Sequence, residues 1–148
     1  MKRRGLFILS FVVVLGTALV FPSIVHQAGT EPALVGDADP AVESILQRSC
    51  QDCHSERTHW PWYAHIPPAS SLVQHDVSVA RSHMNLSHWD QYDSDEKQQL
   101  LKQIRAVVRS RMMPPGRYLL MHPDARLSDE EARRLEQWAK DERHRLAH

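Results

Sequence analysis

Residues 50–54 read Cys-Gln-Asp-Cys-His, and they contain both cysteines of the 148-residue chain. Two thiols three positions apart, with a histidine directly after the second, form the C-x-x-C-H signature of covalent haem attachment. The spacing suits this chemistry because each thiol adds to one vinyl group of the same porphyrin, and the histidine then lies beneath the iron. We therefore predict one haem c bound covalently through Cys50 and Cys53, with its iron ligated by His54.

Two other chemistries use the same pair of cysteines. A structural or redox-active disulfide is one alternative in an oxidising compartment, but the thioredoxin-like version follows a strand, whereas a helical pattern precedes Cys50. A zinc site would draw on two of the ten histidines, yet a second ligand pair at the usual spacing is missing from the sequence. Haem attachment accounts for the motif better than either.

A second iron ligand is expected on the other side of the haem. Met113 is the candidate because it precedes Pro114, where the chain must leave a helix and take an extended path that can present a thioether to the iron. Met112 is adjacent and competes with it. A histidine in this place would give a bis-histidine site of lower potential. The chief histidine candidates are His65, His75 and His122.

Helical spacing of apolar residues dominates the chain after residue 38. It predicts four helices, over residues 39–50, 70–83, 94–112 and 128–145. Asp39 with Pro40 marks the first start, and the capping box of Ser128 with Glu131 marks the last. The second helix is expected to turn four apolar residues inward, Leu72, Val73, Val77 and Ala80. The fold class is therefore all-α, a small helical domain with Pro-rich loops.

An aromatic loop follows the motif, with the sequence Trp-Pro-Trp-Tyr-Ala-His-Ile-Pro-Pro at residues 60–68. Its prolines forbid a continuous helix, while its large aromatic side chains favour burial. Trp60, Trp62 and Tyr63 are therefore candidate haem-binding residues, one as a donor to a propionate and the others as walls of the ring, with plain core packing as the alternative. Further candidates for the propionates are Arg81, Arg117 and Tyr118.

The N-terminus combines three basic residues, at positions 2–4, with an uncharged apolar run from Leu6 to Phe21 that continues to Val25. A helix over residues 6–25 would be about 30 Å long, which is enough to cross a bilayer. No good small-x-small cleavage site follows, because His26 occupies the minus-three position before Gly29, so we predict a retained signal-anchor with a cleaved signal peptide as the alternative. The basic cluster stays in the cytoplasm, which places the rest in the periplasm.

The predicted organisation is a transmembrane segment over residues 1–25, a linker over residues 26–38 and a haem-binding domain over residues 39–148. The protein would lie in a bacterial inner membrane with a single span and its haem domain facing the periplasm.

Charge and motifs narrow the function. The 18 basic and 18 acidic residues balance, which disfavours nucleic acid as a partner. The sequence shows no nucleophile with a dedicated base and no Gly-rich phosphate loop, so we predict no enzyme and no small-molecule substrate. Electron transfer with redox proteins of the periplasm or membrane is the expected role. The alternative is a gas sensor or a peroxidase-like enzyme in which a weak Met113 bond opens.

The sequence resembles the small bacterial haem-binding domain family over about residues 40–140. That resemblance implies haem binding, a cytochrome c-like attachment motif, a Met-Pro-Pro segment before a C-terminal helix and an N-terminal membrane segment. One departure is Met112 beside Met113. The matching features are residues 50–55, Thr58, residues 60–63, residues 113–115, Tyr118, His122-Pro123, and residues 127–130 before Trp138.

Overall fold

The computed structural model describes residues 33–36 and 38–148. The predicted signal-anchor at residues 1–25 lies outside the described residues, as does most of the predicted linker. The chain divides into two compact units, and the described residues belong to the second, Ala33–His148. Its regular structure is helical, and the described residues contain no strand, which confirms the all-α class. None of the helices described is long and apolar enough to cross a membrane.

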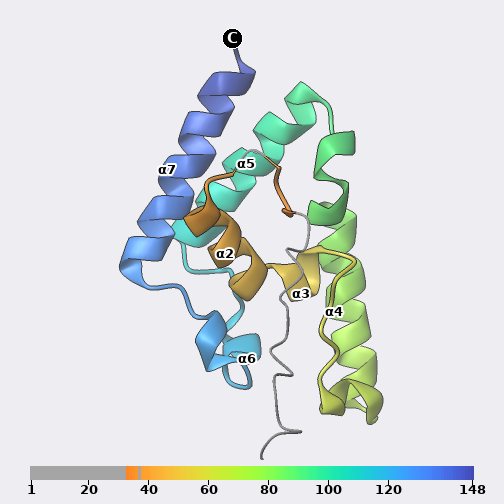
Figure 1. Ribbon diagram of the computed structural model, residues 1–148. Coiled ribbons are helices and arrows are strands. Elements are labelled where there is room, and N and C mark those ends of the chain that lie inside the picture. Colours follow the sequence, from red (N-terminus) through yellow and green to blue (C-terminus); the bar gives the residue numbers. More distant parts are fainter. Residues whose placement is uncertain (1–32, 37) are drawn as a thin grey trace, which may run out of the picture. The chain divides into compact units, whose positions relative to one another are not determined.

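Four longer helices match the four predicted ones, and Figure 1 shows their arrangement. They are α2 (Pro40–Ser49), α4 (Ala69–His83), α5 (Ser94–Arg109) and α7 (Asp129–Leu146). Shorter elements lie between them. These are the helices α3 (Gln51–His54) and α6 (Gly116–Leu119), and the 3-10 turns η1 (Trp62–His65), η2 (Leu86–Gln91) and η3 (Pro123–Ala125).

The helix starts follow local capping chemistry. The Asp39 side chain accepts the backbone N–H groups of Ala41 and Val42 at the start of α2. The predicted capping box of α7 is confirmed, since Ser128 and Glu131 each accept the other's backbone N–H. Helix α5 is capped one residue earlier than its sequence suggested, by Asp93.

Helix α5 ends earlier than predicted, at Arg109, and so it does not reach Met112. Arg111 adopts a left-handed conformation with φ 58°. The Arg111 N–H then donates to Val108 O at 3.1 Å, and the Met112 N–H donates to Val107 O at 3.0 Å. This pair of bonds is a Schellman cap, in which glycine is the usual residue. Pro114 therefore does not stop the helix; the backbone has already turned before it.

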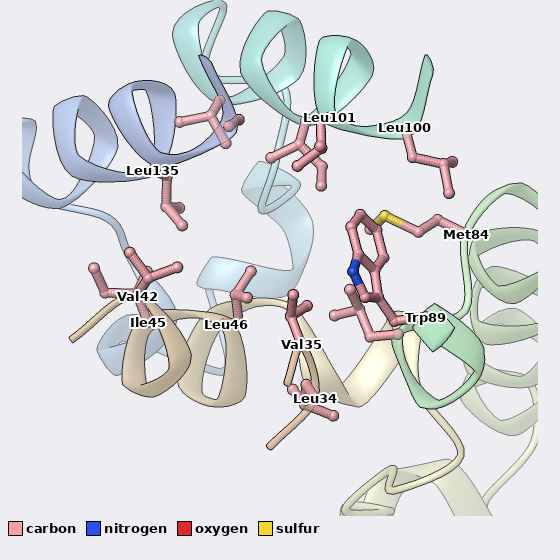
Figure 2. Packing of buried hydrophobic residues seen from close by; sticks show 14 of the residues in the cluster. Leu34, Val35, Val42, Ile45, Leu46, Met84, Trp89, Leu100, Leu101 and Leu135 are labelled. Carbon is pink, nitrogen blue, oxygen red and sulfur yellow. The ribbon is translucent and has the colours of Figure 1, made fainter. Parts of the chain in front are cut away.

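The hydrophobic core lies between α2, α5 and α7, with α5 and α7 packed along each other (Figure 1). Helix α7 contributes Leu135 and Ala139, both fully buried, at helical spacing. The 3-10 turn η2 adds Trp89, which is buried beside Met84 (Figure 2). The sequence pattern alone did not assign Trp89 and Met84 to the core.

The end of the predicted linker belongs to the core. Leu34 and Val35 are buried, and Figure 2 shows both in the packed cluster. Their backbone N–H groups donate to the Glu43 carboxylate, at 2.6 Å from Leu34 and 3.3 Å from Val35. An extended chain keeps its place in a core when its polar groups find such acceptors. The packed core therefore includes Leu34 and Val35, two residues of the predicted linker.

Helix α4 packs less than its sequence predicts. Of the four residues expected to turn inward, only Val77 is buried, while Leu72 is 51% exposed. Val79, on the same helix, is also exposed. The polypeptide therefore leaves much of the apolar surface of α4 uncovered.

Glu131 of α7 pairs with Arg48 of α2, and the contribution of this pair to stability should depend on pH. Its carboxylate accepts from Arg48 of α2 at 2.8 Å, and this bond lowers its pKa to about 2. A carboxylate whose pKa falls on folding stabilises the protein above its unfolded pKa, and this contribution is lost as the pH falls from about 4.5 towards 2. Because the pair is partly exposed, we expect Glu131→Gln to cost about 1 kcal/mol at pH 7.

The measurement is urea unfolding of wild type and Glu131→Gln at pH 7 and pH 3. The difference in unfolding free energy should shrink at pH 3. Glu130→Gln is the matched control, because Glu130 is far more exposed and lies 3.9 Å from Arg134. A Glu131→Gln effect that is the same at both pH values would contradict the linkage.

Candidate functional site

Helix α3 carries the motif, and it lies between α2 and α4 (Figure 1). Cys50 is the hinge between α2 and α3: its N–H donates to Leu46 O at 2.9 Å, and its C=O accepts from His54 N–H at 3.0 Å. Cys50, Cys53 and His54 therefore belong to one helical turn, whose start is set by the packing of α2. Both cysteines are free thiols.

His54 is oriented by a backbone group from another element. Its Nδ1 donates to the carbonyl of Met84, the residue that ends α4, at 3.1 Å. Burial lowers the pKa of His54, so the imidazole is neutral at pH 7. With the proton on Nδ1, the lone pair of Nε2 is available to a metal, and a carbonyl partner of this kind is the usual support of a metal-ligating histidine.

Both thiols have a raised pKa, whereas a disulfide oxidoreductase has a cysteine with a lowered pKa. Burial, with a smaller contribution from the neighbouring Cys53, raises the pKa of Cys50 to about 12. Burial, and then the charge of Asp52, raises the pKa of Cys53. Catalytic C-x-x-C pairs instead depend on a lowered cysteine pKa. The raised pKa values of both thiols thus differ from what a redox-active pair needs.

The zinc alternative also lacks support. No group of three or more His, Cys, Asp or Glu side chains within residues 33–36 and 38–148 is arranged to hold a metal ion. Cys50 and Cys53 therefore have no further zinc ligands beside them in the part of the chain that the structure describes.

Asp52, inside the motif, connects it to the residues just before the aromatic loop. Its Oδ1 accepts the backbone N–H of His59 at 3.0 Å and lies 3.0 Å from His59 Nδ1, while its backbone C=O accepts from Thr58 Oγ1 at 2.6 Å. Its other oxygen, Oδ2, accepts from the hydroxyl of Tyr118 in α6 at 2.9 Å. One side chain thus holds two distant segments against α3.

The segment after Met113 carries a second aromatic contact. Tyr118 and His122 stack with ring centroids 4.2 Å apart and planes 13° apart. His122 Nε2 is hydrogen bonded to Tyr63 Oη at 2.6 Å. Tyr63 therefore contacts the segment after Met113, and one of the two ring nitrogens of His122 is engaged in this bond.

The other predicted histidine ligands, His65 and His75, are exposed. Met113 is 37% exposed and Met112 is 64% exposed. Of these two thioethers, that of Met113 is the more enclosed by the protein.

Two arginines expected near the propionates have protein partners. Arg81 donates from Nε to Ser55 O at 2.8 Å and pairs with Glu56 at 2.8 Å, which stabilises the end of α3. Arg117 forms a two-nitrogen pair with Asp76 of α4. Both arginines thus hold segments of the chain around the motif.

Large exposed apolar side chains occur on the segments around the motif and not on α2, α5 or α7. Among the described residues, the large ones belong to the aromatic loop, α4, and the segment from Met112 to Met121. Asp52 of α3 accepts from His59, just before the aromatic loop, and from Tyr118. Ser55, the residue after α3, accepts from Arg81 of α4. Trp62 is 70% exposed, so core packing, the alternative to haem contact, does not describe this side chain. The residues present fit a flat apolar group attached at α3.

Similarity to known proteins decides the family. The model of the haem-binding domain family matches residues 12–141. This chain belongs to that family. The haem-binding domain is also similar to the cytochrome c peroxidase Ccp of Escherichia coli (strain K12), with 27% identity over 120 residues. The match covers 79% of this chain but only 26% of that protein. No solved structure matches the chain.

Sequence reasoning missed Asp52 and the carbonyl of Met84 as parts of the site. Asp52 occupies a variable position of the C-x-x-C-H pattern, so the motif attached no meaning to it. The Met84 carbonyl is a backbone group 30 residues from His54, and no side-chain signal marks it.

Proposed function

We propose that this haem-binding domain is a membrane-anchored c-type cytochrome that transfers electrons. Thioether bonds from Cys50 and Cys53 would hold the porphyrin, and Nε2 of His54 would ligate the iron. The observation that carries the proposal is the His54 Nδ1 to Met84 O bond beside two free thiols on the same helical turn. This arrangement leaves one nitrogen and two sulfurs ready for one porphyrin.

When bound, haem supplies an iron that accepts and releases one electron at a time. The chain's own residues position and shield it. Met84 O keeps the His54 ring in one tautomer and one orientation, which reduces reorganisation on each electron transfer. The exposed side chains of Trp60, Trp62 and Leu72 would supply apolar surface that covers the bound ring and excludes water from it.

Met113 is the proposed second ligand. Its C-terminal neighbour Pro114 is buried, so the backbone beside the thioether is held in place. A thioether favours ferrous iron and raises the potential relative to a second histidine. His122 is the weaker candidate because its Nε2 is bonded to Tyr63.

The membrane anchor rests on sequence alone. Residues 1–25 combine a basic start with an apolar run of spanning length, and they lie outside the described residues. The domain would then face the periplasm and exchange electrons with proteins of that compartment or of the membrane.

A peroxidase-like activity is the second candidate, favoured by the similarity to a cytochrome c peroxidase. This chain spans about a quarter of the length of that protein, which suits a carrier module as well as a catalytic one. An enzyme would need an iron position open to peroxide, whereas a carrier keeps both positions filled.

One preparation tests the function. Full-length protein produced in a bacterial host with a c-type haem assembly system should remain in the membrane fraction after a salt and carbonate wash. After purification in detergent, the haem should titrate reversibly with one electron, and the ferrous form should not bind carbon monoxide. Rapid turnover of hydrogen peroxide, or immediate carbon monoxide binding, would favour the enzyme or sensor instead. Release of the protein by the wash would contradict the anchor.

A further inference from the structure

A hydrogen bond between Tyr118 and Asp52 ties the Met113 segment directly to the haem-attachment motif. Tyr118 Oη donates to Asp52 Oδ2 at 2.9 Å across 66 positions of sequence. The acceptor belongs to a carboxylate that is 23% exposed. Burial and the charge of Asp52 raise the pKa of Tyr118, so the phenol keeps its proton and remains the donor.

Only four residues separate Met113 from Tyr118, and they include Pro114 and Pro115. Because proline fixes φ, this connection has few free torsions. The position of Tyr118 therefore restricts the position of the Met113 thioether. On the other side, the Arg111 guanidinium donates to Leu127 O at 3.1 Å and to Asp129, which ties the start of the segment to the entrance of α7.

The segment is thus anchored at both ends, and the two anchors differ in what they contact. The Arg111 side chain contacts the start of α7, away from the motif. The Tyr118 anchor reaches the motif itself, where the Asp52 backbone also accepts from Thr58. Nearby, Arg117 pairs with Asp76 through two nitrogens, and this pair joins the segment to α4 and not to the motif. A partly buried hydrogen bond to a carboxylate is of the stronger kind.

We propose that Tyr118, acting through Asp52, is a positioning residue that holds the Met113 segment against the motif and so controls how readily the sixth position at the iron opens to an outside ligand. This rests on the proposed function. The site behaves as a closed carrier while the bond is made, and opens when the bond is lost. The Tyr118–Asp52 bond therefore determines whether the domain acts as an electron carrier or as a protein that binds an outside ligand at the iron.

The test is Tyr118→Phe in the full-length, haem-loaded protein. Phenylalanine keeps the ring that stacks on His122 and removes only the hydroxyl. Ferrous protein is mixed with carbon monoxide at saturating concentration, where binding is limited by opening of the iron. We expect the rate to rise about tenfold to a hundredfold, the range for loss of one charge-assisted hydrogen bond. The ferric near-infrared sulfur-to-iron band should weaken.

Ser94→Ala is the matched control. It also removes a hydroxyl that joins two segments far apart in the sequence, but this hydroxyl donates to the Leu146 carbonyl, at 3.2 Å, and so joins α5 to the end of α7 and not to the motif. We expect its carbon monoxide rate to stay within about twofold of wild type, since the bond to Asp52 is intact. Circular dichroism and haem content should match wild type in both variants, so that a change in rate reports the site and not misfolding.

Three results would overturn the positioning role, and they bear differently on the Met113 ligand. If Met113→Ala binds carbon monoxide rapidly while Tyr118→Phe is as slow as wild type, the positioning role is overturned and the Met113 ligand stands. If Met113→Ala is also slow, Met113 is not the ligand, and the positioning role falls with it. An equal acceleration in Ser94→Ala and Tyr118→Phe would also overturn the proposal, since the effect would then be a general loosening of the domain.

Discussion

Replacement of Cys50 and Cys53 together by alanine is expected to abolish haem retention in denatured protein. Wild type should keep its haem through acid and organic solvent, and its mass should exceed that of the chain by one haem, because both thiols lie on one helical turn and reach one porphyrin. Either single substitution should leave one thioether and reduced retention. Haem staining of a denaturing gel, with the intact mass, measures the result.

Gln47→Ala is the control for this series. Gln47 belongs to α2, about one turn before Cys50, and its side-chain amide donates to Glu43 at 2.8 Å. Its haem retention should equal that of wild type. Complete extraction of haem from wild type would show that the haem is bound without thioether bonds. The His54 to Met84 bond would still orient the ring for a non-covalent haem.

Met113→Ala is expected to open the iron. The variant should lose the near-infrared sulfur-to-iron band, bind carbon monoxide in the ferrous state within the mixing time, and show a lower potential than wild type, because a thioether favours ferrous iron. Absorption spectroscopy and a redox titration measure these three changes. Wild type should bind almost no carbon monoxide and the variant should bind it fully, because no methionine has to leave the iron first.

Met112→Ala is the neighbouring control. Helix α5 has ended at Arg109, and Met112 is the more exposed of the two methionines. Its spectra and potential should remain those of wild type. If Met112→Ala causes the loss, the wrong sulfur has been assigned. If neither substitution does but His122→Ala does, the site is bis-histidine, and electron transfer would proceed at a lower potential.

Sequence reasoning was accurate where structure depends on neighbours in the chain. Asp39 and Ser128 cap the helices that follow them, as predicted, because a cap satisfies N–H groups two or three residues away. It failed at the end of α5. Proline was taken as the terminator, but the left-handed Arg111 ends the helix first, and its side-chain bonds to Leu127 and Asp129 come from 16 and 18 positions further along.

Burial was harder to predict than helicity. Leu34 and Val35 looked like the end of a tether because they lack periodicity, and they enter the core because Glu43 accepts their backbone N–H groups. Helix α4 shows the reverse case, since its apolar residues repeat at helical spacing but Leu72 remains exposed. Periodicity indicates which residues share a face, but not which surface covers that face.

By itself, the sequence determined the helical class, the helix starts and the haem-binding motif, because capping, apolar spacing and C-x-x-C-H all act over a few residues. The tertiary structure decided what surrounds that motif. It brought the Met84 carbonyl to His54 and Tyr118 to Asp52, over separations of 30 and 66 residues. The physical reason is that each of these contacts joins elements whose relative positions depend on the packing of the whole domain, and no local pattern encodes such packing.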